Sequence, residues 1–230
     1  MSASPTPPAT TESHRLLSAT LVIGLLAAAG ALALFSWLGH EIMTDVTLRL
    51  DDRIRLAVHS VASPRLTAIM EALSLYGGPI GLVPLGIVLA AIFLFKRWHR
   101  GALLVVVTMA GAGLLDALLK QSFRRVRPAA FFDYPLPTSA SFPSGHAFFA
   151  ASFFGGLAML ASARIRNPLL QALIWTGAAV LILLVGLSRV YLGVHYPSDV
   201  LAGYAAATVW VAAVAFGDRI VRYRRLRRSA

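Results

Sequence analysis

The sequence contains no cysteine, and only 13% of its 230 residues are charged. Without cysteine the chain cannot form disulfides, a thiolate nucleophile, or cysteine-ligated zinc and iron–sulfur sites. The low charge content also argues against a soluble domain, because 57% of the residues are hydrophobic and the mean hydropathy is +0.71. One soluble core of this size could not bury that much apolar surface, so the composition predicts an integral membrane protein.

The charges that are present are mostly basic, with a formal net charge of +11. Such an excess can indicate a nucleic-acid-binding protein. Here, however, the cations cluster at the ends of apolar segments, which is where Lys and Arg lie in proteins that cross a membrane. We therefore expect membrane lipids, and no nucleic acid, as partners.

Long apolar runs dominate the chain, and six of them approach the roughly 20 residues that a helix needs to cross a bilayer. They are Leu16–Leu38, Pro79–Phe95, Ala102–Leu119, Ala147–Ala163, Leu169–Leu187 and Val200–Phe216. The first run is longer than the apolar core of a signal peptide, roughly 7–15 residues, so we expect a retained helix. The sequence predicts an all-α, polytopic membrane protein with a bundle of six transmembrane helices.

The remaining segments define the predicted domain organisation. Residues 1–15 are rich in Ser, Thr and Pro and are expected to form a disordered leader. Residues 16–217 form one membrane domain, and 218–230 form a basic tail that can contact anionic lipid headgroups. Between the first two spans, Ile54–Val61 and Leu66–Leu75 mix apolar and polar residues, which is typical of short interfacial helices.

Orientation follows from the distribution of Lys and Arg. With the amino terminus inside, 12 of the 21 Lys and Arg residues fall on the cytoplasmic side. An excess of positive charge marks the cytoplasmic side of a membrane protein, so we expect both termini there. The loop after span three and the loops before spans four and six then share the extracytoplasmic side.

Those three outer segments hold most of the polar residues that could carry chemistry. Together they supply three cations, two imidazoles and a carboxylate that could surround one phosphate. The candidate residues are Lys120, Arg127, Ser144, Gly145, His146, Arg189, His195 and Asp199.

The segment before span four is a candidate anion site. Ser144 follows a proline and precedes an apolar run, which favours a helix start with Ser144 as its cap. Free backbone N–H groups at such a start attract anions, and Gly145 would let a phosphate oxygen approach closely. His146 can exchange a proton near neutral pH. The alternative is that this segment is only a helix-starting turn.

The segment before span six is a candidate nucleophile. Pro197 marks the first turn of the span, so His195 and Asp199 lie four residues apart across a helix entrance. A carboxylate at that spacing can accept a hydrogen bond from one imidazole nitrogen and leave the other free. Arg189, at the end of span five, can hold phosphate oxygens in a fork. The alternative is a structural histidine.

The segment after span three supplies two more cations. Lys120 and Arg127 are seven residues apart and would share a face if the helix continued. Alternatively, Lys120 pairs with Asp116, four residues earlier, and merely neutralises it. In that case Arg124 and Arg125 would be interfacial anchors.

Together these residues resemble the signature of the type 2 phosphatidic acid phosphatase (PAP2) superfamily, specifically its integral-membrane bacterial lipid phosphatases. The three motifs read Lys120-Gln-Ser-Phe-Arg-Arg-Val-Arg127-Pro128, Pro143-Ser144-Gly145-His146 and Ser188-Arg189-Val-Tyr-Leu-Gly-Val-His195-Tyr-Pro-Ser-Asp199. All three match in order and without a gap, and the resemblance covers roughly residues 66–216.

The resemblance implies that His195 forms a phosphohistidine, Asp199 orients its ring and His146 transfers protons. It also implies a set of phosphate ligands, namely Lys120, Arg127, Ser144, Gly145 and Arg189. It implies no metal and no cofactor, since fixed cations can neutralise the phosphate. Expected substrates are undecaprenyl pyrophosphate, phosphatidylglycerophosphate or phosphatidic acid. The alternatives are a lipid-to-lipid phosphotransferase, a soluble-type vanadate haloperoxidase, which six apolar spans disfavour, and a non-catalytic phospholipid-binding transporter or scaffold. The sequence leaves the oligomeric state open.

Overall fold

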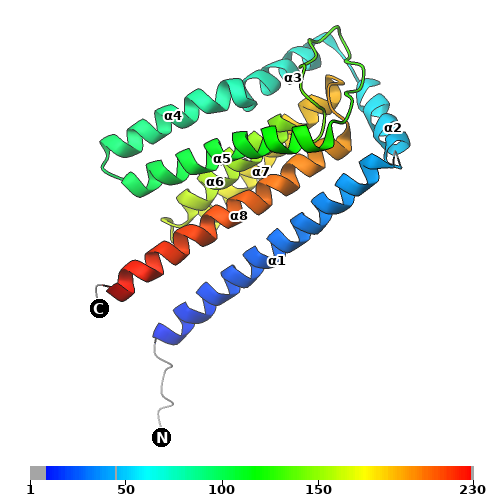
Figure 1. Ribbon diagram of the computed structural model, residues 1–230. Helices are drawn as coiled ribbons and strands as arrows, with labels where there is room; N and C mark the ends of the chain where they lie inside the picture. Colours follow the sequence, from blue (N-terminus) through cyan, green and yellow to red (C-terminus); the bar gives the residue numbers. More distant parts are fainter. Residues whose placement is uncertain (1–8, 45, 229–230) are drawn as a thin grey trace, which may run out of the picture.

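The computed structural model describes residues 9–44 and 46–228, and within these ranges every regular element is an α-helix. Figure 1 shows the arrangement. The helices are α1 (Ala9–Met43), α2 (Leu48–His59), α3 (Pro64–Gly77), α4 (Pro79–Phe95), α5 (His99–Phe123), α6 (Gly145–Ser162), α7 (Pro168–Tyr191) and α8 (Pro197–Arg228). The prediction of an all-α protein is confirmed.

Five described helices are long and apolar enough to cross a membrane, namely α1 from Leu21 onward, α5, α6, α7 and α8. The fourth helix has only 17 residues. It qualifies together with α3, which precedes it at a bend of 44°. Counted as one broken span, this pair brings the number to the six that the sequence predicts.

The bend between α3 and α4 lies at Gly78. This residue is extended, with φ −93° and ψ −175°, and Pro79 opens α4 without an N–H group of its own. The sequence predicted a short helix at Leu66–Leu75, and a separate helix forms there with wider bounds, α3, which is bent by 44° against α4. The absence of a side chain at Gly77 also lets α3 approach Val185 of α7 closely.

Two predicted boundaries differ from the structure. Helix α1 begins at Ala9, so a leader without secondary structure does not hold for residues 9–15, and residues 1–8 lie outside the described part. Helix α8 runs without a break through the predicted boundary at 217/218. In both cases an existing apolar helix is extended into polar sequence, which costs less than starting a new helix.

The bundle is built around α6, which packs against α4, α5, α7 and α8, while α1 lies at the edge against α8 (Figure 1). The core beside the bend contains Leu82 of α4, Phe149 and Phe153 of α6, and Val185 of α7. Burial of such side chains stabilises the helix contacts and holds the ends of α6 and α7 in place.

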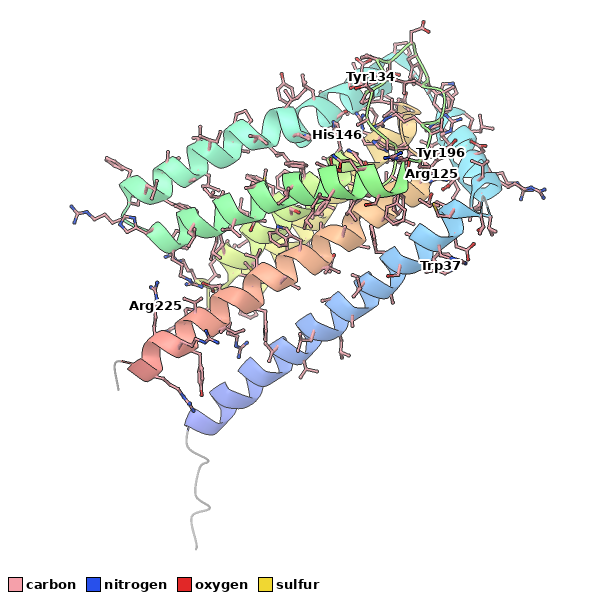
Figure 2. All side chains as sticks on the ribbon, in the orientation of Figure 1. Trp37, Arg125, Tyr134, His146, Tyr196 and Arg225 are labelled. Carbon is pink, nitrogen blue, oxygen red and sulfur yellow. The ribbon has the colours of Figure 1, made fainter. Side chains whose placement is uncertain are left out.

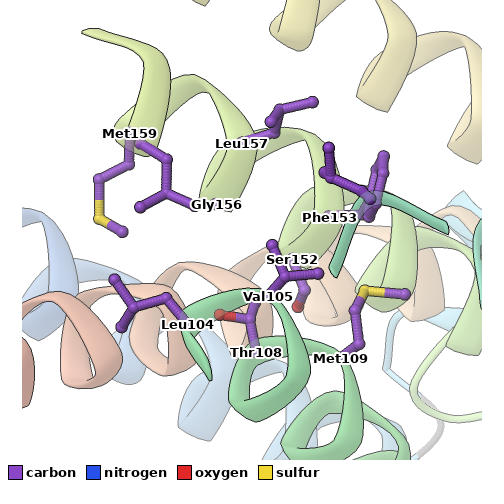
Figure 3. A pocket seen from close by; sticks show the side chains of 11 residues that line it. Leu104, Val105, Thr108, Met109, Ser152, Phe153, Gly156, Leu157 and Met159 are labelled. Atoms are coloured by element: carbon purple, nitrogen blue, oxygen red, sulfur yellow. The ribbon is translucent and has the colours of Figure 1, made fainter. Parts of the chain in front are cut away.

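Figure 3 shows a small cavity between α5 and α6, in the middle of the bundle. Its volume is about 10 Å³, and its walls include Val105, Thr108, Ser152 and Phe153. A space that holds about one water molecule cannot admit a lipid headgroup. A lipid phosphate must therefore bind elsewhere, and the predicted site residues lie at the ends of the helices.

Candidate active site

The ends of α5 and α7 and the starts of α6 and α8 meet at one end of the bundle, together with the loop 124–144 (Figure 1). Backbone hydrogen bonds tie this loop down: the N–H of Phe131 donates to the carbonyl of Leu192, and the N–H of Ser144 donates to the carbonyl of Asp199. In Figure 2, Arg125, Tyr134, His146 and Tyr196 gather at this end, far from Arg225. The fold thus brings the three predicted polar clusters together.

His195 and Asp199 lie at the entrance to α8, which begins at Pro197 as predicted. Nδ1 of His195 lies 3.4 Å from Oδ2 of Asp199, and both residues are almost fully buried. The same oxygen accepts hydrogen bonds from the Ser141 hydroxyl at 2.5 Å and from the backbone N–H of Tyr196 at 2.9 Å. The carboxylate is therefore held rigidly beside the imidazole.

The other ring nitrogen of His195 identifies the tautomer. Nε2 lies 3.0 Å from Nη1 of Arg127, and a guanidinium can only donate hydrogen bonds. Nε2 must therefore be the acceptor, and the ring proton is on Nδ1, facing Asp199. This tautomer places the lone pair on Nε2, which can attack phosphorus once the hydrogen bond from Arg127 is released.

His146 lies in the first turn of α6, and its ring packs against the bend between α3 and α4. A Cβ atom at Gly78 would lie 2.5 Å from Nε2 of His146 and would also clash with its Cδ2. His146 interacts electrostatically with Arg189, His195, Lys120 and Arg127, so both imidazoles border one cationic site. Gly78 therefore makes the space that the second histidine occupies.

Lys120 was expected either to face the anion site or to pair with Asp116, and the structure shows that it does both. Its Nζ donates to Oδ2 of Asp116 at 2.8 Å, so the ion pair does form. The pair also lies against the start of α6, because a Cβ atom at Gly145 would be 2.8 Å from Lys120 Nζ and 3.0 Å from both Asp116 oxygens. Lys120 thus faces the predicted anion site while keeping a carboxylate partner.

Arg127 is held by the surrounding loops. Its guanidinium donates to the carbonyls of Ser139, Ala140 and Val194 as well as approaching His195. The helix ends at Phe123, so Arg127 reaches the site from the loop and not from a continued helical face.

Arg189 is more isolated than Arg127. Only 1% of its surface is exposed, Nη1 donates to the Ser74 hydroxyl, and Nε has no hydrogen-bond partner. No carboxylate in the described ranges lies within ion-pair distance of it. A buried, uncompensated guanidinium is costly and favours the binding of an anion.

Ser144 occupies the predicted N-cap position of α6, but its side chain makes no capping hydrogen bond. Its Oγ is buried and has no partner. The capping prediction is therefore right in position and wrong in contact. A buried hydroxyl without a partner at a helix start provides a donor for an anion there.

The electrostatics of the loops match these contacts. Burial lowers the pKa of His195 to about 4, with Arg127 and Arg189 also lowering it and Asp199 opposing them. Burial and the charge of Arg189 lower the pKa of Arg127 to about 10. At neutral pH the imidazole is therefore uncharged and nucleophilic, while the guanidinium keeps its charge.

The sequence alone did not identify Arg125 as part of the site. The alternative that Arg125 is an interfacial anchor is wrong. Its side chain is only 9% exposed and donates to Oδ1 of Asp199 at 2.6 Å and to Oδ2 of Asp51 at 2.9 Å. Burial disfavours the charge of Arg125, but Asp199 and Asp51 outweigh it and raise its pKa. Both partners lie 74 residues away, so no local pattern indicates them.

The described residues contain no group of three or more His, Asp or Glu side chains that could hold a metal ion. The polar side chains at the site end are mostly cations and donors, which suit an anionic ligand.

Comparison with known proteins gives consistent results. The profile of the PAP2 superfamily matches residues 101–220, a range that contains every predicted site residue. Phosphatidylglycerophosphatase B of Bacillus subtilis is 32% identical over 194 residues, covering 83% of this chain and 94% of that protein. An undecaprenyl-diphosphatase of Sulfolobus acidocaldarius is 31% identical over 151 residues, 64% of this chain and 67% of that one.

A solved structure is also similar over most of its length. The crystal structure of a transmembrane PAP2 type phosphatidylglycerolphosphate phosphatase from Bacillus subtilis has a TM-score of 0.77 and 30% identity. The match covers 84% of this chain and 96% of that one. The similarity therefore extends from the motifs to the arrangement of the helices.

Proposed function

The chain belongs to the PAP2 superfamily, and we propose on this basis that it is an integral-membrane phosphatase that hydrolyses a lipid phosphomonoester or pyrophosphate. The relatives named above are phosphatases whose names refer to phospholipid and polyprenyl substrates. The helical spans place the enzyme in the membrane where such substrates reside.

One observation carries the proposal. Arg189 is buried without a carboxylate partner, at the end of the bundle where two histidines and an unpaired serine hydroxyl also lie. Such a site is electrostatically incomplete until an anion binds. A phosphoryl group has the charge and the several oxygens that these donors require.

The first chemical step uses His195 as the nucleophile. Its Nε2 lone pair forms a bond to phosphorus while the bond from phosphorus to the leaving oxygen breaks. His146 donates a proton to that oxygen, so the product leaves as an alcohol or as a lipid monophosphate. Asp199 accepts the Nδ1–H bond and stabilises the positive charge that develops on the ring.

Arg127 is suited to stabilise the transition state more than the ground state. Its Nη1 faces Nε2 of His195 before the reaction. Once that lone pair is used in the new bond to phosphorus, the donor becomes free for a phosphoryl oxygen. An interaction gained only during the reaction accelerates it, whereas uniform binding would not.

Lys120, Arg189, the Ser144 hydroxyl and the Gly145 N–H complete the expected phosphate cradle. In the second step a water molecule attacks phosphorus, His146 takes its proton, and the bond between phosphorus and His195 breaks. Inorganic phosphate leaves and the neutral imidazole is restored. The fixed cations provide the charge neutralisation, so this proposal requires no metal ion.

Access to the site fits a substrate whose phosphate is in water while its tail stays in lipid. Lys120 and Arg127 also border an open pocket of about 560 Å³, whose other walls include residues 136–140. We propose that the headgroup approaches from this side. The three expected substrates share an anionic headgroup on an apolar tail, and this chemistry is what the site recognises.

The proposed orientation puts both termini in the cytoplasm and the site on the extracytoplasmic face. The described parts of α1 and α8 begin and end at the same end of the bundle, opposite the loop 124–144 (Figure 1). The connections that contain Lys96, Arg97 and Arg164 also lie at the end opposite the site. A positive excess there supports a cytoplasmic assignment.

The test is phosphate release by purified protein in detergent with EDTA. A panel of phosphatidylglycerophosphate, phosphatidic acid and undecaprenyl pyrophosphate should show release from at least one lipid. His195→Ala should abolish release and keep the thermal unfolding transition. Turnover that depends on an added metal ion, or an active His195→Ala variant, would refute the proposal.

The same assay separates hydrolysis from phosphotransfer. Inorganic phosphate should appear in proportion to the lipid consumed, because water is the acceptor. Transfer of the labelled phosphoryl group to an added lipid alcohol without phosphate release would identify a phosphotransferase instead. Binding without any turnover would identify a transporter or scaffold.

A further inference from the structure

Asp199, the carboxylate beside the nucleophile, is itself held by a buried ion pair. Its Oδ1 accepts a hydrogen bond from Nη1 of Arg125 at 2.6 Å, while Oδ2 faces Nδ1 of His195 at 3.4 Å. The Asp199 side chain has no exposed surface. A carboxylate in that setting needs a compensating charge to stay ionised, and Arg125 is the cation in direct contact with it.

Arg125 is in turn fixed from a distant helix. Its Nη2 donates to Oδ2 of Asp51 on α2 at 2.9 Å, and its guanidinium lies 4.1 Å from the centre of the Tyr196 ring. Two carboxylates and one aromatic face thus define the plane of the guanidinium. Lysine could neutralise one carboxylate but could not bridge both.

Asp51 also connects α2 with the start of α8. Its Oδ1 accepts from the backbone N–H of Ser198 at 2.9 Å, and its Oδ2 accepts from the Ser198 hydroxyl at 2.6 Å. A carboxylate at a helix start satisfies free N–H groups and is stabilised by the helix dipole. The entrance of α8, where Asp199 lies, is therefore attached to α2.

A second residue of α2 strengthens this attachment. Arg55, one turn after Asp51, donates to the carbonyl of Ala129 at 2.7 Å and to that of Gly193 at 3.4 Å. These carbonyls belong to the two loops that carry Arg127 and His195. The face of α2 that bears Asp51 and Arg55 is thus packed against the loops of the site. This helix therefore has a structural role at the site in addition to any contact with the membrane interface.

We propose that Arg125, held in place by Asp51 of α2, is a positioning residue that fixes the carboxylate of Asp199 and, through it, the reactive tautomer of His195. This inference depends on the proposed function, because it assigns a role in the step that uses His195 as the nucleophile. Arg125 acts through Asp199 and does not touch the phosphate. Its loss should slow the chemical step and leave phosphate binding intact.

The neighbouring arginines show why the assignment goes to Arg125. Arg124 is exposed, and its Nε donates only to the carbonyl of Gln121, within its own helix turn. Arg127 faces Nε2 of His195, on the side of the ring where phosphorus must bind. Arg125 alone of these three reaches the carboxylate on the opposite side of the ring.

The experiment compares Arg125→Ala and Arg125→Lys with Arg53→Ala, which removes an exposed guanidinium of α2 outside the network. We expect Arg125→Ala to lower kcat about 10²-fold, since Asp199 without its guanidinium partner holds the productive tautomer of His195 less well. KM and the inhibition constant of inorganic phosphate should change less than about threefold, because the phosphate ligands are untouched. Arg125→Lys should recover about a tenth of wild-type kcat or more.

Asp51 is tested against its neighbour Asp52, whose side chain is 44% exposed and only pairs with Arg55 at 3.4 Å. Asp51→Asn should lower kcat about tenfold, whereas Asp52→Asn loses only a solvent-screened ion pair and should change kcat less than about twofold. In the double variant with Arg125→Ala, Asp51→Asn should cost less than about twofold further, because both act through one network. Arg125→Lys and Asp51→Asn retain polar side chains of similar volume, so they remain informative if Arg125→Ala does not fold.

The outcomes separate this inference from the proposed function. If His195→Ala stays active in the same assay, the proposed function fails. If His195→Ala is inactive while Arg125→Ala behaves like Arg53→Ala, only the positioning role is overturned. A large rise in KM or in the inhibition constant of phosphate for Arg125→Ala would also overturn it, because Arg125 would then be a phosphate ligand.

Discussion

The two ends of the helical bundle use arginine in opposite ways. At the site end, Arg189 is buried and the side chain of Arg125 is only 9% exposed, and both are held by specific partners on other elements. At the far end, Arg100 pairs with Asp218 while 43% of its side chain remains exposed. Charge screened by solvent contributes little to stability or chemistry, whereas a buried cation either has a partner or creates a need for one. The comparison indicates that burial, more than net charge, distinguishes the functional cations of this basic protein.

The largest expected effect is at the site end, for Arg189→Met. Removing a cation that faces the developing phosphoryl charge should lower kcat/KM by about 10³-fold. The melting temperature should not fall, because the wild-type protein buries this charge without a carboxylate partner. Parallel activity assays and thermal melts in the same detergent provide the measurement. Activity within tenfold of wild type, or a strongly destabilised variant, would break the comparison.

The second prediction probes how tightly the site end is packed. Gly78→Ala should lower kcat about 10²-fold, because the added methyl group must displace the ring of His146. Gly155→Ala on α6 is the matched control, since its Cβ atom would meet nothing within 4 Å. The control should keep full activity and gain a little helix stability. Equal activity of both variants would show that His146 does not need its observed position.

The spans illustrate what the sequence could predict. The run Pro79–Phe95 was expected and found with the same bounds, because proline opens this helix and two cations follow it. The extension of α1 to Ala9 and the bend that joins α3 to α4 were not foreseen. Apolar pattern locates the part of a helix that needs burial, but it does not show where a polar extension ends or which short helices align.

The site residues also differ in whether the sequence could predict them. The eight predicted residues meet at one end of the bundle because they lie in local motifs at helix ends. Arg125 and Asp51 form contacts over 74 residues of sequence, and each resembles an ordinary surface charge in its local context. Long-range partners of this kind are set by tertiary packing, which no spacing rule in a single sequence reveals.

The third prediction uses pH to sharpen the contrast between buried and exposed groups. Protonated His195 cannot attack phosphorus, and burial lowers its pKa to about 4. Below that pH, kcat/KM should fall about tenfold per pH unit, and it should not depend on this group between pH 5 and 7. An acid limb near pH 6.5 that persists in His146→Ala and has the same midpoint for every lipid of the panel would show that His195 is not buried as described.

The same pKa has a consequence for stability. The folded-state pKa of His195 lies below its ordinary value, so the unfolded chain binds the proton first as the pH falls. The contribution to stability is complete above pH 6.5 and is lost between pH 6.5 and about 4. Thermal melts should therefore show a decrease over this window that is smaller in His195→Ala.

The smallest effect is expected at the far end of the bundle. Arg100→Ala removes a half-exposed ion pair with Asp218 and should cost at most about 1 kcal/mol of stability. Because the pair lies at the end opposite the site, kcat/KM should remain within about twofold of wild type. A loss of activity as large as that of Arg189→Met would mean that the two ends are coupled.

The most direct test is to trap the covalent intermediate in the proposed pocket. His146→Ala protein should be mixed with a ³²P-labelled lipid pyrophosphate, whose leaving group depends least on acid catalysis, then quenched at alkaline pH and digested for mass spectrometry. We predict an acid-labile phosphohistidine at His195, accumulating because His146 no longer activates water, and its absence in His195→Ala. Label on another residue, or turnover without any phosphorylated His195, would contradict the assignment of the nucleophile and with it the proposal that both histidines act on one phosphoryl group.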